Sequence, residues 1–507
     1  MKIYLDNPKF QYELDTIARQ YCNAPVFVDI SDEMFSLLSE REQNLIKLTM
    51  EDAIRQQEIA DLSADESDFL ILQEKSDMAI AKGILFGERI DGAQKKFAYE
   101  KNLKNAYKRL LYEICSSAYD KRLDWGILSG IRPSKLYGET FKNAGDAQKA
   151  NRDFAQSYLV NPQKIEVLEQ IYFLQEKMLG DIDRNDFSIY VSVPFCPSKC
   201  NYCTFFSNEV AKKSALIEPY LQALAIELES ILSSPWAKSR RADTLYIGGG
   251  TPSTLSASEL MRFLKLLQSH IDFPALKEIT FEAGRPDTID REKLGVLKDF
   301  GIDRISINPQ TMVDATLAKI GRGHTAQEII DAFHLAREVG FDNINMDIIL
   351  GLENENLSDL KYTLSELEKL SPDSITVHSL ALKKASDLTK SISQNLADQQ
   401  YLRVSRMMNF IYESLKAEYL PYYLYRQKKI LGGQENVGFA KRNKSSLYNM
   451  IIIEEYQNIL SFGPGAVSRF VYPDENRIER CANTKNLENY IGNIKQFISR
   501  KTQEMSL

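Results

Sequence analysis

The second part of the chain, from about Asp186 onward, repeats one pattern: an apolar strand-like run, a loop, and a stretch with helical periodicity. Six such runs are predicted at 188–193, 244–247, 278–282, 304–308, 343–350 and 374–378. Parallel strands joined by helical crossovers form either a barrel or an open doubly wound sheet. In a barrel of this kind the loops after the carboxyl ends of the strands carry the chemistry.

Three cysteines lie in the loop after the first predicted strand: Cys196, Cys200 and Cys203. A disulfide does not account for them, because an odd number of close thiols leaves one unpaired. Zinc usually takes four closed ligands, and the remaining cysteines and the four histidines offer no second pair at a suitable spacing. Iron–sulfur clusters normally have four cysteine ligands, so three imply an iron that is open to a substrate or cofactor. The loop favours such a cluster over zinc and over a metal-free group of buried cysteines.

Polar motifs follow the later strands at the same topological position. The turn Gly248–Thr251 has little side-chain bulk, so its backbone can approach a ligand closely, and it departs from the GxxxxGK[ST] and GxGxxG phosphate motifs. The segments after the next strands are EAGRPD (282–287), PQ (309–310), GRGH (321–324) and NMD (345–347). Each has a structural alternative, since Asp347 can cap a helix and Arg322 can be solvated. Together they predict one site at the barrel mouth.

Read together, these segments resemble the radical S-adenosylmethionine (SAM) superfamily. Within it they resemble the oxygen-independent coproporphyrinogen III oxidase (dehydrogenase) family, in particular its long HemZ-type branch, over essentially the whole chain. The segments that carry the resemblance are YVSVPFCPSKCNYC, YIGGGTPSTL, FEAGRPDTI, RISINPQTM, IGRGHT, NMDIILGL, TVHSLALKKAS and YLYRQKKILGGQENVGFA. The implied fold is α/β: a partial (β/α)6 radical SAM barrel at 181–395, an N-terminal α+β domain of unknown role at 1–180, and a small substrate-covering domain at 396–507.

The resemblance also assigns roles to residues. Cys196, Cys200 and Cys203 would ligate a [4Fe-4S] cluster whose fourth iron binds the amino and carboxylate groups of SAM. The residues that would contact SAM are Tyr190, Tyr202, Gly249, Gly250, Thr251, Glu282, Gln310, Arg322 and Asp347. The cluster and the 5′-deoxyadenosyl radical would perform the chemistry, so no further catalytic residue is expected.

The reaction implied by the resemblance belongs to haem biosynthesis. Two propionates of coproporphyrinogen III would be oxidatively decarboxylated to vinyl groups, giving protoporphyrinogen IX without oxygen. The C–H bond to be broken has no useful acidity, which favours a radical over acid–base catalysis. An external electron donor and acceptor are expected partners. The alternatives are a haem-binding chaperone or a radical SAM haem-modifying enzyme with the same cluster, and a structural zinc protein.

A substrate with four propionates requires cations, and the segment 421–444 is a local source of them. It contains one acid, Glu435, and six basic residues: Arg426, Lys428, Lys429, Lys441, Arg442 and Lys444. Arg426, which lies among tyrosines, is predicted to bind substrate because guanidinium groups bind carboxylates in bidentate fashion. The alternative is a solvated surface turn. His378 is also predicted to face the substrate, with a structural role as its alternative. The segment 462–466, FGPGA, resembles a glycine turn of the family's C-terminal domain.

The N-terminal part reads as an α+β domain, with strand-like runs at 2–5, 25–30, 69–73 and 78–82 and amphipathic stretches at 44–62 and 102–122. The segment WGILSGIRPSKL (125–136) is predicted to be either a packed turn or part of a binding surface.

The composition limits the possible partners. A net charge of −7 argues against nucleic acid held by bulk electrostatics. We find no apolar run long enough for a membrane span and no signal-peptide pattern at the N-terminus. Six cysteines in 507 residues form no disulfide framework. We therefore expect a cytoplasmic protein.

Overall fold

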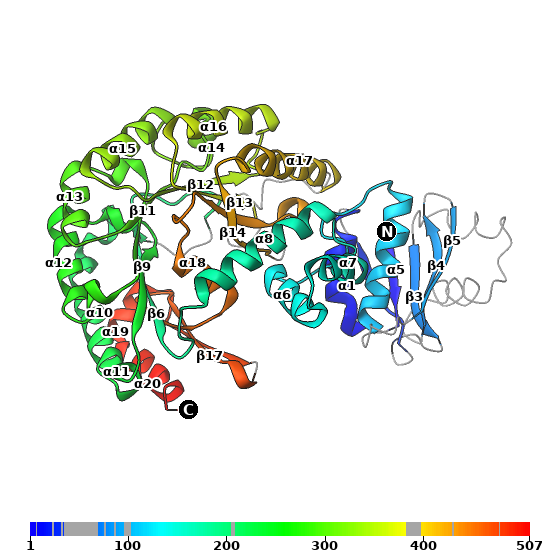
Figure 1. Ribbon diagram of the computed structural model, residues 1–507, viewed down its shortest axis with the longest axis horizontal. Coiled ribbons are helices and arrows are strands. Elements are labelled where there is room, and N and C mark those ends of the chain that lie inside the picture. The colour runs from blue at the N-terminus through cyan, green and yellow to red at the C-terminus, as the bar shows by residue number, and fades with distance from the viewer. Residues whose placement is uncertain are drawn as a thin grey trace.

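The computed structural model of the protein describes residues 1–6, 8–22, 25–31, 34, 69–75, 78–85, 88–95, 103–203, 208–381, 397–427, 430–475 and 477–506. The helix predicted at 44–62 lies outside these residues. In Figure 1 a curved row of helices surrounds a sheet at one end of the molecule, and a smaller sheet stands at the other end.

The N-terminal domain contains a sheet of order β2-β1-β3-β4-β5. Its strands are β1 (Lys2–Leu5), β2 (Val26–Asp29), β3 (Phe69–Lys75), β4 (Met78–Leu85) and β5 (Glu88–Lys95). The helices α1 (Gln11–Ala18) and α5 (Leu103–Ala118) share one apolar core with this sheet. Four strands and α5 confirm the predicted pattern. The sequence does not predict β5, because ERIDGAQK is too polar to show apolar alternation.

Three helices connect this sheet to the barrel: α6 (Pro133–Ala144), α7 (Ala147–Tyr158) and α8 (Pro162–Leu179). Their common core includes Trp125 and Leu424, the latter from a strand near the C-terminus. Gly126 has a φ of 48°, and a Cβ atom there would lie 2.3 Å from the carbonyl oxygens of Tyr158 and Leu159. Only glycine fits such a position. The start of the segment 125–136 is thus a packed turn, and its last residues, from Pro133, begin α6.

The barrel consists of six parallel strands that are neighbours in chain order. They are β6 (Phe187–Val193), β9 (Ala242–Gly249), β10 (Glu278–Gly284), β11 (Arg304–Ile307), β12 (Ile344–Leu350) and β13 (Ser374–Ser379). The connecting helices are α10 (Ile217–Leu232), α12 (Ala257–Gln268), α13 (Arg291–Asp299), α15 (Ala326–Val339) and α16 (Leu357–Leu370). A doubly wound sheet reverses its strand order at a switch point, whereas these six strands keep one order from β6 to β13. The predicted six-stranded barrel is confirmed.

The C-terminal strands extend the same sheet at both edges. Among the described residues, β16 (Asn458–Phe462) pairs with β6 and is followed by β17 (Val467–Tyr472) and β18 (Arg477–Ala482). At the other edge β15 (Asn436–Ala440) pairs with β13 and with β14 (Leu420–Tyr425). The last helices are α17 (Ala397–Leu415), α19 (Leu487–Gly492) and α20 (Ile494–Glu504). The division into three domains stays a prediction. Strands between residues 420 and 482 belong to the same sheet as the barrel strands.

One C-terminal helix, α18 (Leu447–Glu454), lies on the concave side of the barrel (Figure 1). Glu278, the first residue of β10, caps it by accepting hydrogen bonds from the Leu447 N–H at 2.6 Å and the Ser446 hydroxyl at 2.9 Å. The Tyr448 ring stacks on Tyr246 of β9 with 4.6 Å between centroids. This helix therefore fills the interior from the amino ends of the strands.

Two buried ion pairs join distant parts of the chain. Lys501 Nζ lies 2.6 Å from Glu227 Oε1 and connects α20 to α10. Lys164 Nζ lies 2.6 Å from Glu435 Oε1, and Glu435 also accepts a 2.7 Å hydrogen bond from the Trp125 indole. The second pair fixes the N-terminal helices to the barrel sheet. No described helix is long and apolar enough to traverse a bilayer.

Candidate functional site at the barrel mouth

The cysteine loop starts directly after β6. Cys196 ends the short strand β7 (Phe195–Cys196), Cys200 is buried, and Cys196 and Cys203 are partly exposed. The loop is anchored from the far side of the barrel. The Asn201 N–H donates to the carbonyl of Ile320 at 3.0 Å, and its side-chain amide donates to the carbonyl of Lys319 at 2.9 Å. The three thiols are therefore presented on a loop fixed by backbone contacts.

The glycine turn after β9 packs directly against this loop. The Gly250 and Thr251 N–H groups donate to the carbonyls of Val193 at 2.8 Å and Phe195 at 2.7 Å. A Cβ at Gly250 would lie 2.5 Å from the Phe195 oxygen, and Gly249 has a φ of 110°. Thr251 Oγ1 lies 3.4 Å from Cys196 Sγ. Glycine is required to bring the turn against the cysteine loop, and the approach of its backbone to a ligand stays a prediction.

Glu282, at the end of β10, is a carboxylate with no ion-pair partner in the described part of the chain. It accepts a 2.6 Å hydrogen bond from the Tyr246 hydroxyl, and a Cβ at Gly248 would lie 2.8 Å from its Cδ. Burial raises the pKa of Glu282 to about 7, the charge of Asp347 adds to the rise, and the Tyr246 hydrogen bond opposes it. The side chain is partly exposed beside the glycine turn. It is placed to accept a cationic group from a ligand.

Asp347 on β12 faces His378 on β13. Its Oδ1 accepts a 2.7 Å hydrogen bond from the Asn345 amide, and its Oδ2 lies 3.7 Å from His378 Nε2. Burial alone would raise the pKa of Asp347, but His378 and Asn345 together hold it below its usual range. The contacts with His378 and Asn345 thus favour an ionised carboxylate. His378, predicted to face substrate, is turned toward Asp347.

Gln310 adopts a left-handed backbone conformation, with a φ of 68°. Two hydrogen bonds fix it, from its N–H to the Asp347 carbonyl and from the Ile349 N–H to its own carbonyl, each 2.9 Å. Its Oε1 is buried and has no hydrogen-bond partner among the described residues. A strained residue with an unsatisfied acceptor is typical of a ligand site.

Arg322 contacts Tyr202, another of the residues predicted to contact SAM. Its guanidinium donates to the Tyr202 hydroxyl at 2.7 Å and to the Gly284 carbonyl at 3.3 Å. Tyr202 lies between Cys200 and Cys203 in the sequence, so this bond also fixes the cysteine loop. Tyr190 on β6 lies deeper and forms a stack with Tyr246, at 6.1 Å, and Tyr448, at 6.4 Å. The structure thus brings together the cysteines and eight of the nine predicted SAM contacts around one mouth, with Tyr190 below it.

Arg426 stands apart from this group. Its guanidinium donates to the carbonyl of Leu128, and to that of Gly433 at 2.9 Å, and lies 5.1 Å from the centroid of the Trp125 ring. Burial lowers the pKa of Arg426 to about 10, with Glu435 opposing. These contacts join the N-terminal helices to the sheet and favour a structural role over the predicted substrate role.

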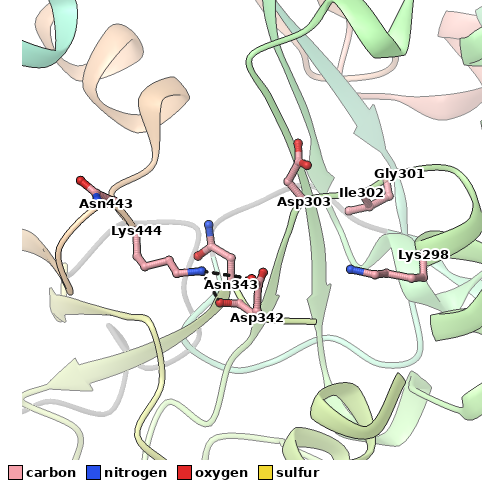
Figure 2. A pocket seen from close by; sticks show the side chains of 8 residues that line it. All are labelled: Lys298, Gly301, Ile302, Asp303, Asp342, Asn343, Asn443 and Lys444. Carbon is pink, nitrogen blue, oxygen red and sulfur yellow. Dashed lines mark hydrogen bonds and ion pairs between the residues drawn. The ribbon is translucent and has the colours of Figure 1, made fainter. Parts of the chain in front are cut away.

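Two other basic residues of this segment, Lys441 and Lys444, also lie away from the mouth. Lys441 donates to the Ser371 carbonyl at 3.2 Å, and Lys444 to the Asp342 carbonyl at 2.6 Å. Both acceptors precede strands, so these lysines lie at the amino ends, opposite the cysteine loop. Figure 2 shows Lys444 beside Asp342 and Asn343 at a small cavity there. Lys428 and Lys429 lie outside the described residues, and Arg442 is exposed.

Three residues of the site have no role in the sequence prediction: Tyr246, Tyr448 and Arg285. A signal exists for Tyr246, because it lies two residues before Gly248 on a strand and so faces the same side. Arg285 belongs to a motif that the sequence singles out. Tyr448 reaches the site from a helix about 200 residues away in the chain, and no local pattern indicates it.

Comparison with known proteins places this geometry in a family. The radical SAM superfamily model matches residues 190–367. The oxygen-independent coproporphyrinogen-III oxidase-like protein HemZ of Bacillus subtilis is 40% identical over 384 residues, which are 74% of this chain and 76% of the relative. The chain belongs to the HemZ family.

Other relatives of this HemZ-family chain bear different names. The heme chaperone HemW of Bacillus subtilis is 30% identical over 288 residues, 55% of this chain and 70% of HemW. The oxygen-independent coproporphyrinogen III oxidase of Escherichia coli is 31% identical over 194 residues, 38% of this chain and 42% of the relative. The solved structure of the Escherichia coli coproporphyrinogen III oxidase HemN matches with a TM-score of 0.48 and 22% identity, over 64% of this chain and 72% of HemN.

Proposed function

We propose that this chain is a radical SAM enzyme of haem biosynthesis that decarboxylates two propionates of coproporphyrinogen III to vinyl groups without oxygen, giving protoporphyrinogen IX. The observation that carries the proposal is the convergence of the cysteine loop, the glycine turn and the unpaired carboxylate of Glu282 at one mouth. Two relatives, HemZ and the Escherichia coli oxidase, bear names that refer to this reaction. An external electron donor and an electron acceptor complete the reaction.

The residues present fit a [4Fe-4S] cluster. Within the described ranges no three His, Cys, Asp or Glu side chains converge closely enough for a single metal ion. A cluster has no such requirement, because each thiolate binds a different iron. Cys196, Cys200 and Cys203 would hold it on a loop anchored at Asn201. The nearby Arg285 guanidinium, 4.0 Å from Cys200 Sγ, suits thiolates.

The same mouth offers complementary groups for SAM. Among the described residues Glu282 forms no ion pair, so it can accept the α-ammonium group, and Thr251 and the glycine backbone border the same space. Gln310 Oε1 and Arg322 supply an acceptor and a donor farther around the rim. When bound, the cluster and SAM supply a carbon radical able to remove hydrogen from a C–H bond of negligible acidity. The contribution of the chain is to position these groups and to exclude water.

A second candidate function is haem binding without turnover, as in a carrier protein. The observation that favours it is the similarity to HemW, named a heme chaperone, of which this chain covers 70%. The site would then hold haem beside the cluster. The two candidates differ in whether SAM is consumed in proportion to a decarboxylated product.

The test is an anaerobic assay of the reconstituted, reduced protein with SAM and coproporphyrinogen III, with 5′-deoxyadenosine and the vinyl product measured together. We expect both products in the wild type and neither in Cys200→Ala. Cys22→Ala, which alters a partly exposed cysteine of the N-terminal domain, serves as the matched control and retains both. Deoxyadenosine without vinyl product would remove coproporphyrinogen as the substrate, and tight haem binding without SAM cleavage would establish the carrier function. SAM cleavage by Cys200→Ala would refute the cluster assignment.

A further inference from the structure

We infer that Arg285 is a positioning residue for the cluster: it fixes the cysteine loop between its first two ligands and donates an N–H to the Cys200 sulfur, which raises the reduction potential of the cluster. This inference rests on the proposed cluster at Cys196, Cys200 and Cys203. It concerns the retention and the potential of that cluster, not the identity of the substrate.

The first support is the contact of Arg285 with the cysteine loop. Arg285 follows β10 and is only 4% exposed. Its Nη1 donates to the Ser198 hydroxyl at 2.8 Å and to the Ser198 carbonyl at 3.3 Å. The same nitrogen lies 4.0 Å from Cys200 Sγ, at the outer limit for a donor to sulfur. One buried guanidinium edge therefore contacts the loop at two residues between Cys196 and Cys203.

The second support is the way the guanidinium is oriented. Its other edge forms a bidentate pair with Asp287, from Nε to Oδ1 at 2.9 Å and from Nη2 to Oδ2 at 2.7 Å. Burial would raise the pKa of Asp287, but His324 and Arg285 hold it well below its usual range. The ionised carboxylate fixes the plane of the guanidinium, so Nη1 can point only toward the cysteine loop. Lysine cannot do the same, because its ammonium is a single point charge.

The expected effects follow from the charge of the cluster. Each reduction adds a negative charge, and a donor to a ligating sulfur stabilises the reduced form more than the oxidised form. Loss of such a donor lowers the potential. Groups behind metal ligands also contribute to retention, and their removal typically costs about 10- to 100-fold in metal affinity. Arg285 thus acts on both properties, whereas a residue that only joined two loops would affect folding alone.

The experiment compares four variants of the full chain after anaerobic reconstitution. Arg285→Gln combined with Asp287→Asn removes the guanidinium together with the charge of the carboxylate that orients it. Arg285→Lys keeps the charge and loses the geometry. Ser198→Ala removes one loop contact and keeps the donor to Cys200. Arg291→Gln serves as the control. Arg291 begins α13, the helix after the same loop, and is an exposed arginine that pairs with Glu338 of α15.

The readouts are iron and sulfide per chain, the rate of iron loss to a chelator, the reduction potential followed by visible absorption and electron paramagnetic resonance, and the melting temperature of the cluster-free chain. We expect the double variant and Arg285→Lys to lose iron at least about ten-fold faster and to have a more negative potential, with little change in melting of the cluster-free chain. Ser198→Ala should lose iron somewhat faster at the wild-type potential, and Arg291→Gln should match the wild type.

Wild-type potential and iron retention in both Arg285 variants would overturn the inference. So would an unchanged potential accompanied by a large fall in melting temperature, which would mark a purely structural residue. If the wild type itself takes up no cluster, the inference falls together with the proposed function. If the wild type takes up the cluster but forms no vinyl product, only the substrate proposal falls, and the Arg285 comparison is decided as above.

Discussion

Glu227 and Glu282 show how differently one side chain is used in two regions of this barrel. Each accepts a 2.6 Å hydrogen bond from a tyrosine hydroxyl, Tyr490 for Glu227 and Tyr246 for Glu282. Glu227 is fully buried and also pairs with Lys501, so its charge is balanced inside the protein. Glu282 is partly exposed and, within the described chain, forms no ion pair, although the more distant His378 lowers its pKa. In this protein the structural carboxylate, Glu227, is neutralised by a cation of the chain itself. The carboxylate without such an ion pair, Glu282, lies at the proposed ligand site.

The largest effect should come from removing the balanced carboxylate. Glu227→Gln leaves the Lys501 ammonium buried with the Ser461 carbonyl but without a counter-charge, which should lower the free energy of unfolding by about 3–5 kcal/mol. Chemical denaturation of the cluster-free chain measures it. Adding Lys501→Met should recover much of the loss, because the unpaired charge is removed. A loss below about 1 kcal/mol in the single variant would contradict the structural role.

The next effect concerns the unbalanced carboxylate. Glu282→Gln should weaken SAM binding about 10- to 100-fold, because a charge-assisted hydrogen bond is worth about 1.5–3 kcal/mol. At pH 7.5 the free energy of unfolding should rise rather than fall, because the raised pKa of Glu282 means that its ionised form destabilises the folded chain. Equilibrium binding of SAM to the reconstituted protein tests the first statement, and denaturation tests the second. Unchanged SAM affinity would remove Glu282 from the site.

The pH dependence sharpens the same contrast. The pKa of Glu282 is raised from 4.5 to about 7, so the free carboxyl is mostly protonated below pH 7. Binding of an ammonium group requires the ionised form, so SAM affinity should fall up to about ten-fold per pH unit below 7. The raised pKa also affects the free energy of unfolding. The protonated Glu282 carboxyl stabilises the folded chain; this contribution is complete below pH 4.5 and is lost as pH rises through 7. Glu282→Gln should flatten both profiles, and a flat wild-type profile between pH 5.5 and 7 would contradict the assignment.

The smallest effect separates the two tyrosines. Tyr246→Phe removes a hydrogen bond that lowers the pKa of Glu282, so the midpoint of the SAM-affinity profile should move to higher pH. At pH 7.5 the affinity should fall about 2- to 10-fold, the equivalent of one net hydrogen bond. Tyr490→Phe, the matched change at Glu227, should lower stability by about 1 kcal/mol and leave SAM binding unchanged. The same titration and denaturation series measures both variants.

The predictable part of this molecule is what a local pattern encodes. The six barrel strands follow from apolar runs at regular spacing, and their order brings the cysteine loop, Glu282, Gln310 and Asp347 to one edge. Arg426 shows the limit of such reasoning. A sequence shows its charge and its tyrosine neighbours, but not that the Leu128 carbonyl, about 300 residues earlier, accepts its hydrogen bond.

Glu435 and Tyr448 show the same limit at other places. The motif around Glu435 looks like a binding loop, yet its carboxylate is buried against Lys164 of α8 and Trp125 of the turn before α6. Tyr448 meets Tyr246 only because α18 enters the barrel from the C-terminal part of the chain. Contacts between elements so far apart depend on the complete fold, and no local pattern specifies them. The roles of the predicted SAM residues stay predictions for the assays above.

The pairing of β16 with β6 has a consequence for how the protein is made. The strand that leads into the cysteine loop has β9 on one side, but its other neighbour is residues 458–462, some 270 residues later. Until those residues leave the ribosome, β6 is an unpaired edge that can bind the strand of another chain. Such distant pairing is also slow to form. Assembly of the site therefore comes late in synthesis, and a cell that overproduces this protein should find its yield limited by aggregation of unfinished chains.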